Sequence, residues 1–220
     1  MSFLDRLLRP FGNGTTTGAP YPGIEFPALE TKHLEGAKLF ADRKDLIASL
    51  PLAPGGTIAE IGVERGDFSE FLLSALQPAR FVAFDIFTLH DARSRRGRRE
   101  IAYNSEFYGR RFAARGDQVA MEVGPSDVTL ARYPDRSFDL IYIDAGHDYP
   151  SVERDAALGM QKVKPGGFLV FNDYIMFDHL IGMPYGIVPV VNDIVVRENL
   201  VIYGFSLEKH MFCDIAFRRP

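Results

Sequence analysis

Two apolar segments that each run into an acidic residue constrain the fold of this chain more than any other feature. Residues 57–63 read Thr-Ile-Ala-Glu-Ile-Gly-Val and enter a turn with glycines at Gly62 and Gly66, while residues 81–87 place Asp85 after Phe-Val-Ala-Phe. Short apolar runs of this kind are typical of buried strands in a parallel sheet. Glycine after such a strand lets a ligand approach the backbone. An acid at the end of the next strand is where parallel α/β folds bind the ribose hydroxyls of a nucleotide.

The rest of the chain alternates between extended and helical patterns. We expect further strands at 119–123, 137–144 and 167–173, helices at 34–50, 68–76 and 151–163, and two extended runs at 200–205 and 210–217. Strands that alternate with helices of about a dozen residues predict a parallel sheet with helices on both faces, and the last two runs read as a closing hairpin. The chain therefore divides into an N-terminal arm and linker, 1–33, and one domain, 34–220.

Composition excludes several classes of function. The chain has 220 residues, 46% of them hydrophobic, and a formal net charge of −4, which does not favour a nucleic-acid binder. The single cysteine, Cys213, excludes an intrachain disulfide and a cysteine-based zinc site. Because no apolar run approaches the roughly 20 residues that span a bilayer, and no secretory signal is evident, we expect a cytoplasmic protein without a membrane partner.

The spacing of the glycines separates two families of nucleotide ligand. The run is Glu60-x-Gly62-x-x-x-Gly66, whereas a dinucleotide fingerprint would read G-x-G-x-x-G, and Glu64 would repel a pyrophosphate. The pattern resembles motif I of class I S-adenosylmethionine-dependent methyltransferases, and the resemblance covers roughly residues 35–220. It implies a Rossmann-like α/β fold with a mostly parallel seven-stranded sheet that ends in an antiparallel hairpin. It also implies that S-adenosylmethionine binds at Glu60, Gly62, Gly66 and Asp85.

Polar residues follow the fourth and fifth predicted strands. Asp144 and His147 come after the fourth strand, and Asn172 and Asp173 come after the fifth. Open α/β sheets bind ligands beyond the carboxyl ends of their strands, so these side chains should converge. Two carboxylates and an amide oxygen suit a hard divalent ion such as Mg²⁺ or Mn²⁺. His147 is placed to act as a general base.

These two motifs resemble the metal-dependent small-molecule O-methyltransferases, including sugar-modifying enzymes. Catechol-type relatives order the second pair Asp-Asn, whereas this chain has Asn172-Asp173. The resemblance implies metal ligands at Asp144, Asn172 and Asp173, catalytic roles for Asp144 and His147, and an additional cofactor contact from Asp144. After the third strand the family usually places an acid near the adenine; Pro125 stands there, so this contact passes to Ser126 or the backbone.

We therefore expect metal-assisted O-methylation of a small-molecule hydroxyl on a sugar or phenol. An arginine run at 93–99 leaves open an anionic acceptor, and related enzymes are commonly homo-oligomers. Three alternatives remain: a metal-independent methyltransferase that uses Asp144 and His147 for acid–base chemistry, an NAD-dependent oxidoreductase, and a non-catalytic relative that binds the cofactor. The sequence does not identify the acceptor.

Overall fold

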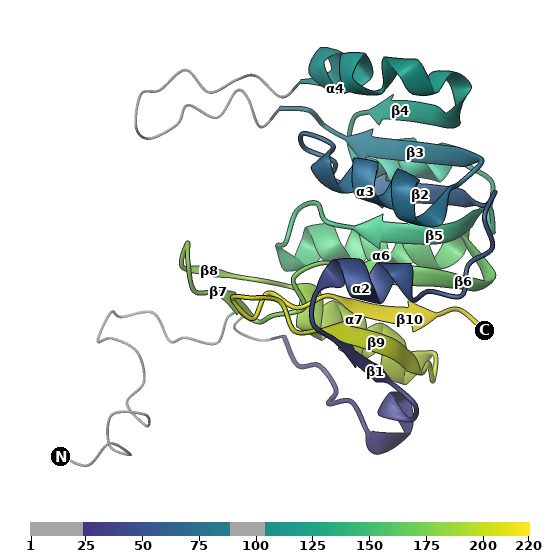
Figure 1. Cartoon of the computed structure of the whole chain (residues 1–220). Coiled ribbons are helices and arrows are strands. Elements are labelled where there is room, and N and C mark those ends of the chain that lie inside the picture. The colour runs from purple at the N-terminus through teal and green to yellow at the C-terminus, as the bar shows by residue number, and fades with distance from the viewer. Residues whose placement is uncertain (1–23, 89–103) are drawn as a thin grey trace.

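The computed structural model describes residues 24–88 and 104–220 (Figure 1). The arginine run at 93–99 and most of the arm lie outside these residues. The strands, in chain order, are β1 (Lys38–Phe40), β2 (Thr57–Ile61), β3 (Arg80–Asp85), β4 (Val119–Val123), β5 (Phe138–Ile143), β6 (Val163–Phe171), β7 (Phe177–Asp178), β8 (Met183–Pro184), β9 (Ile202–Ser206) and β10 (Ile215–Arg218). The helices and 3-10 turns are η1 (Thr31–Leu34), α2 (Arg43–Ala48), α3 (Asp67–Leu76), α4 (Ser105–Phe112), η3 (Ala113–Gln118), α5 (Ser126–Thr129), η4 (Leu130–Arg132), α6 (Tyr149–Lys162) and α7 (Ile187–Arg197).

The main sheet has the strand order β1-β9-β10-β6-β5-β2-β3-β4. Strand β10 runs antiparallel to both of its neighbours, β6 and β9, and the other paired strands are parallel. The predicted mostly parallel sheet with a closing antiparallel hairpin is therefore confirmed. Among the described residues the sheet has eight strands in place of the seven expected, because β1 pairs with β9 at the edge, from Lys38 opposite Gly204 to Phe40 opposite Ser206.

The helix predicted at 34–50 is wrong in its first half, where β1 lies instead. Gly36 has a φ of 77°, which breaks a right-handed helix before β1 begins. Helix α2 starts only after Asp42, whose carboxylate accepts the backbone N–H groups of Lys44 (2.8 Å) and Asp45 (3.0 Å). This N-cap satisfies donors that have no partner within the helix, so it fixes where α2 starts.

Helices cover both faces of the sheet, as the alternation of strand and helix predicts (Figure 1). Successive side chains of a strand point to opposite faces, so Ile58 and Ala59 of β2 enter different cores. Ile58 packs with Leu46 and Leu72 from the α2 and α3 side. Ala59 packs with Ala156 and other residues from the α6 and α7 side. Burial on both faces explains why β2, β3 and β5 are almost continuously apolar.

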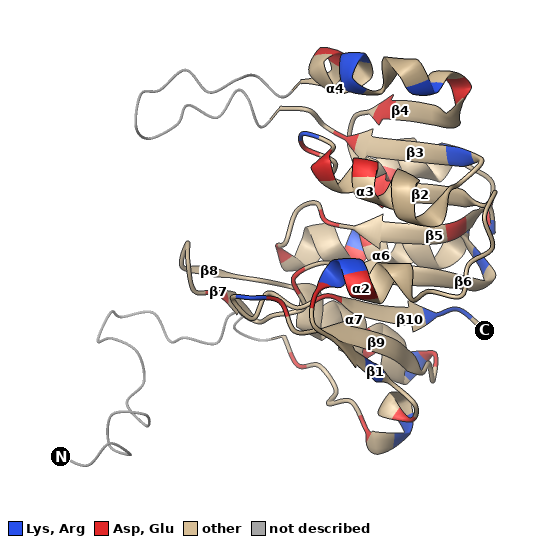
Figure 2. Ribbon diagram, in the orientation of Figure 1, with Lys and Arg blue, Asp and Glu red and all other residues tan. Residues whose placement is uncertain are grey.

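The carboxyl ends of the parallel strands gather at the left edge of the sheet in Figure 1. Acidic segments mark the ends of β3 and β4 and the loop into α3 at this edge (Figure 2). In the described ranges, no helix is both long enough and apolar enough to cross a membrane.

Candidate active site

Backbone hydrogen bonds between neighbouring strands continue one residue past the strand ends, and they place three predicted site residues next to one another. The N–H of Gly62 donates to Phe84 (2.8 Å), that of Asp144 to Ile61 (2.8 Å), and that of Asn172 to Ile143 (3.0 Å). Each is the first residue after its strand, so the loops after β2, β5 and β6 start side by side. The sheet register therefore positions these residues.

A cavity of about 660 Å³ opens at these strand ends. Its lining contains the predicted residues Glu60, Gly62, Asp85, Ser126, Asp144 and His147. The charged side chains around it are predominantly acidic: Glu60, Glu64, Asp67, Asp85, Asp127, Asp144 and Asp155, against Arg43, Arg65 and Arg154. A cavity with more carboxylates than cations favours a ligand that carries positive charge.

The two glycines of the turn are required by the packing of the protein itself. A Cβ at Gly62, which has a φ of 86°, would lie 2.1 Å from the carbonyl oxygen of Asp144. A Cβ at Gly66, with a φ of 81°, would lie 2.6 Å from the ring of Phe112 and 2.8 Å from that of Tyr108. Gly66 does not line the cavity. Its place is at the start of α3, where the backbone needs a left-handed residue.

Glu60 is a buried acid inside the cavity wall. Its carboxylate accepts a hydrogen bond from the hydroxyl of Ser69 (2.5 Å), which in turn accepts one from the hydroxyl of Tyr108 (2.9 Å). Burial raises the pKa of Glu60 to about 8. The hydrogen bond from Ser69 and the charge of Arg43 both lower this pKa, but their effect is smaller than that of burial. A cation bound beside Glu60 would offset this desolvation, so the site favours a positively charged group.

Asp85 braces the glycine turn from the end of β3. One carboxylate oxygen accepts the N–H groups of Val63 (2.9 Å) and Glu64 (3.0 Å), and the other accepts that of Phe87 (2.6 Å). A carboxylate has about four acceptor positions, so Asp85 can still accept from a ligand. Asp85 therefore joins the two loops that frame this side of the cavity.

At the far side of the cavity, Ser126 is bound to an acid that the sequence analysis missed. Its hydroxyl donates to Asp155, which lies on α6 and is 3% exposed. Burial raises the pKa of Asp155 to about 6. Asp155 lies within a segment that is predicted only as an amphipathic helix, and its partner Ser126 begins a different helix, α5, so no local pattern indicates their contact.

Asp144 and His147 line the cavity, and Asp173, which does not line it, lies close to His147. The Nε2 atom of His147 lies 3.8 Å from an oxygen of Asp144 and 3.6 Å from an oxygen of Asp173. Burial raises the pKa of Asp144 well above its usual value, although the charge of Arg43 opposes this, and burial also raises the pKa of Asp173 to about 6. Two carboxyl groups thus flank one imidazole nitrogen.

The imidazole of His147 is held on several sides. Its ring stacks on Tyr185 with centroids 4.4 Å apart, and its backbone carbonyl accepts the N–H of Gly186 (2.7 Å). Burial lowers the pKa of His147, and a hydrogen bond to the side chain of Asn172 partly offsets that effect. A neutral, fixed imidazole is suited to accept a proton.

Asn172 connects His147 to an acid that sequence reasoning also missed. The Asn172 amide nitrogen donates to Asp214 (3.0 Å), and the hydroxyl of Tyr142 donates to the other oxygen of Asp214 (2.7 Å). Asp214 is completely buried, and burial raises its pKa to about 7. Because the amide nitrogen faces Asp214, the amide oxygen of Asn172 is the atom left to accept from His147.

Arg43, at the start of α2, is a third residue that the sequence analysis missed. Its guanidinium lies 3.5 Å from Asp144, donates to the hydroxyl of Tyr142 (3.2 Å) and stands 4.3 Å above the ring of Phe68. Burial alone would lower the pKa of Arg43, but neighbouring Tyr142, Asp214 and Asp144 hold it above its usual value. Arg43 is separated from Tyr142 by 99 residues in the sequence, so no local pattern indicates the contact.

Comparison with known proteins identifies the family. A family model described as a methyltransferase domain matches residues 59–174, from β2 to just beyond β6. The chain belongs to this methyltransferase family. The match includes the glycine turn, the loop after β5 and the Asn172-Asp173 pair, so the residues described above lie mostly within it.

Solved methyltransferases share the fold at low sequence identity. A putative methyltransferase in complex with the Haloferax volcanii Trm112 activator is 12% identical, with a TM-score of 0.58 over 80% of this chain and 87% of that chain. An O-methyltransferase family protein from Burkholderia thailandensis is 13% identical, with a TM-score of 0.56 over 80% and 55%. A geranyl diphosphate methyltransferase in complex with S-adenosylmethionine is 13% identical, with a TM-score of 0.54 over 81% and 84%.

Other comparisons are less informative about function. The chain spans 25% and 62% of the length of two further solved methyltransferases. A search of curated proteins gives no match.

Membership of this family decides between two of the sequence-based alternatives. The chain contains a methyltransferase domain, and this argues against the NAD-dependent oxidoreductase. The acidic cavity at the carboxyl ends of β2, β3 and β5 is suited to a ligand with a sulfonium and an ammonium group. The cofactor contacts predicted at Glu60, Gly62 and Asp85 stay predictions, and their side chains or backbone line that cavity.

The predicted metal ligands are oxygen donors of the kind that a hard cation prefers. Asp144 and Asp173 present carboxylate oxygens on either side of His147 Nε2, and Asn172 adds an amide oxygen that His147 also engages. Within residues 24–88 and 104–220, no group of three or more His, Cys, Asp or Glu side chains is arranged to hold a metal ion. The metal site thus stays a prediction that depends on two carboxylates and one amide.

Proposed function

We propose that this methyltransferase transfers the methyl group of S-adenosylmethionine to a hydroxyl of a small-molecule acceptor, with assistance from a divalent cation. The observation that carries the proposal is the position of His147. It lines the cavity at the strand ends, and its Nε2 atom lies within 4 Å of carboxyl oxygens of both Asp144 (3.8 Å) and Asp173 (3.6 Å). A hydroxyl is a poor nucleophile until its proton leaves, so a base at this point is what O-methylation needs.

Glu60 and Asp85 would hold opposite parts of the cofactor. The buried carboxylate of Glu60 would face the ammonium group, where the added positive charge stabilises its ionised form. Asp85 retains lone pairs for the ribose hydroxyls, and the half-exposed side chain of Ile86 offers an apolar surface for the adenine. The loop after β5 lines the same cavity with His147, so an acceptor bound beside the cofactor would lie within reach of this imidazole.

His147 would remove the proton of the acceptor hydroxyl as the methyl group is transferred. Tyr185 and Gly186 fix the ring and the backbone of His147, and Asn172 fixes its protonated nitrogen. Asp144 and Asp173 would hold the divalent cation, with the Asn172 oxygen as a third donor. When bound, such a cation lowers the pKa of the acceptor hydroxyl and orients it for in-line attack.

A metal-independent transfer is the second candidate, and the position of Arg43 favours it. Its guanidinium already supplies a positive charge 3.5 Å from Asp144. A guanidinium can stabilise a developing alkoxide by charge and hydrogen bonding, without a metal ion.

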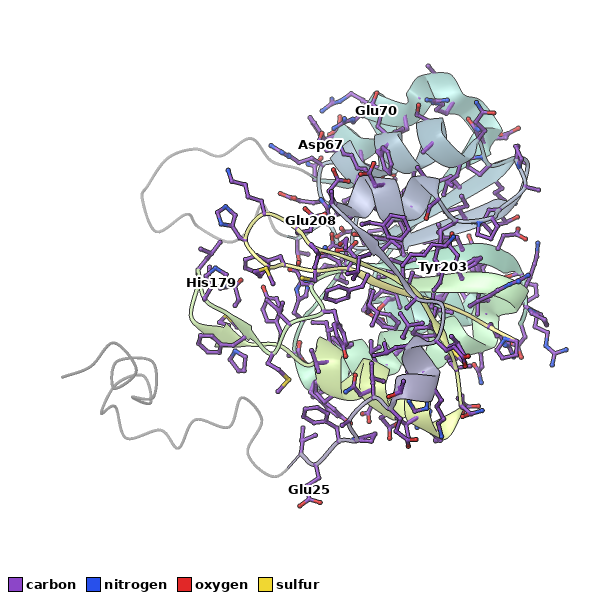
Figure 3. The ribbon with its side chains drawn as sticks, turned by 60° about the horizontal axis from the view of Figure 1, so that its bottom comes forward. Glu25, Asp67, Glu70, His179, Tyr203 and Glu208 are labelled. Atoms are coloured by element: carbon purple, nitrogen blue, oxygen red, sulfur yellow. The ribbon has the colours of Figure 1, made fainter. Side chains whose placement is uncertain are left out.

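Transfer of a labelled methyl group into a panel of sugars and phenols tests the proposal. Activity that requires added Mg²⁺ or Mn²⁺ and is lost in chelator supports metal assistance, and full activity in chelator supports the Arg43 alternative. His147→Gln should lower kcat by about a hundredfold or more, the usual contribution of a general base. His179→Gln is the matched control, because His179 does not line the cavity and lies at the outer edge of the molecule (Figure 3). Equal activity of the two variants would show that His147 is not the general base.

A further inference from the structure

Three polar residues of the cofactor cavity lie in a row across the sheet. Glu60 belongs to β2, Asp85 ends β3 and Ser126 follows β4, and these strands are neighbours in the order β2-β3-β4 (Figure 1). The N–H of Gly124 donates to the carbonyl of Asp85 (2.9 Å), so the loop after β4 starts beside the end of β3. Two strand spacings separate the ends of the row, roughly 10 Å. With the ammonium group at Glu60 and the ribose at Asp85, the base of the cofactor falls at the Ser126 end.

This end of the cavity contains a buried acid, Asp155, that the proposed reaction does not use. Asp155 belongs to α6, lines the cavity and is 3% exposed. Val152 and Ala156, which precede and follow it on α6, are packed in the core, so the backbone that carries Asp155 is held in place. The hydroxyl of Ser126 donates to one carboxyl oxygen. A carboxylate has about four acceptor positions, so Asp155 can accept further hydrogen bonds from a ligand.

The chemistry of Asp155 suits the edge of an adenine ring. Burial raises its pKa to about 6, so at neutral pH the group is mostly ionised and only accepts hydrogen bonds. Adenine presents an exocyclic amino group with two N–H donors, whereas hypoxanthine and guanine present a carbonyl oxygen at the same ring position. That oxygen would face a carboxylate without a proton between them. A buried acceptor of this kind therefore distinguishes adenine from the other two bases.

The other carboxyl group near Ser126 is less suited to this role. Asp127 also lines the cavity, but its side chain is 42% exposed and lies 3.8 Å from Arg154. Water and the guanidinium compete for its oxygens, so a hydrogen bond from a ligand gains little there.

We propose that Asp155 accepts a hydrogen bond from the exocyclic amino group of adenine and determines the specificity of the cavity for this base. The Ser126 hydroxyl holds the carboxyl in position, and the side chain of Ile86 contacts the face of the ring. This inference rests on the proposed function for the orientation of the cofactor in the cavity.

Calorimetric titration of the full chain with S-adenosylhomocysteine and with S-inosylhomocysteine, at a pH above the pKa of Asp155, tests the inference. The two ligands differ only in the base, where a carbonyl oxygen replaces the amino group, so the ratio of their Kd values isolates this contact. The wild type should bind the adenosyl ligand at least about tenfold more tightly, the usual worth of a hydrogen bond to a charged group. Asp155→Asn should reduce the ratio to less than about threefold, because the amide can donate to the carbonyl oxygen of the inosyl ligand.

Asp127→Asn is the matched control. It removes the same charge from the same cavity and should keep the wild-type ratio within about twofold, since an exposed, ion-paired carboxyl contributes little. Ser126→Ala leaves Asp155 ionisable but unsupported, so its ratio should lie between those of the wild type and Asp155→Asn. This variant also covers the case in which Asp155→Asn fails to fold.

The remaining outcomes separate the inference from the proposed function. If the wild type binds both ligands equally, or Asp155→Asn keeps the wild-type ratio, the inference is overturned and the proposed function stands. The same holds if Asp127→Asn lowers the ratio as much as Asp155→Asn does, because the base is then recognised by the loop after β4. If the wild type binds neither ligand, the cofactor site of the proposed function fails together with the inference.

Discussion

Replacing Glu60 with glutamine should stabilise the folded protein, and the gain should grow with pH. Glu60 is 1% exposed, and burial raises its pKa from 4.5 to about 8. Below pH 4.5 the carboxyl is protonated in both the folded and the unfolded chain, so its burial has no effect on stability through ionisation. As the pH rises, the unfolded chain releases this proton first, and the folded state loses stability until the pH passes the folded pKa.

The magnitude follows from the two pKa values. One pKa unit corresponds to about 1.4 kcal/mol, so the full loss approaches about 5 kcal/mol above the folded pKa. Between about pH 5 and about pH 8 the loss is about 3 kcal/mol. Glutamine has a similar shape, can accept the Ser69 hydroxyl and does not ionise, so the variant should not show this loss.

Urea unfolding followed by circular dichroism measures the effect, since the chain has no tryptophan to report on it. The free energy of unfolding of Glu60→Gln relative to wild type should rise by about 3 kcal/mol over this pH range. Glu64→Gln is the matched control, because Glu64 lies exposed in the same turn and should give no such trend. A difference between Glu60→Gln and wild type that is the same at both pH values would refute the reasoning.

Two further predictions concern the cofactor cavity. Gly62→Ala should cost about 1–3 kcal/mol more stability in urea unfolding than Gly55→Ala, because an added Cβ overlaps the Asp144 carbonyl only at Gly62. The two glycines have φ angles of 86° and 84°, so equal losses would mean that backbone conformation alone is responsible. Glu60→Gln should bind S-adenosylmethionine about tenfold more weakly in calorimetry at about pH 8.5, since a charged hydrogen-bonding partner of the ammonium group is lost. Unchanged affinity would place the ammonium group away from Glu60.

The strands could be predicted because their pattern is local. Residues 57–63, 81–87 and 137–144 are apolar on both faces and end in glycine or an acid, so burial and direction follow from a short stretch of chain. The first strand could not be predicted in this way. Lys38–Phe40 is largely exposed at the sheet edge, and the strand with which it pairs, β9, lies near the other end of the sequence.

The roles of the turn glycines show a second limit. The sequence predicts that a ligand approaches the backbone at Gly62 and Gly66. The fold shows that protein atoms already require these glycines, namely the Asp144 carbonyl at Gly62 and the rings of Tyr108 and Phe112 at Gly66. A glycine pattern indicates that some group approaches the backbone closely, but it does not identify that group as a ligand or as part of the protein.

The sequence by itself determined the run of strands from β2 to β6 and the acids that follow several of them, because these depend on local hydrophobic periodicity and on the rule that parallel strands end at one edge. Only the tertiary structure decided what surrounds those acids. Arg43 reaches Tyr142 across 99 residues, and Tyr142 reaches Asp214 across 72. Contacts between residues so far apart in the chain depend on how the helices pack on the sheet. Such packing produces no periodic pattern in the sequence.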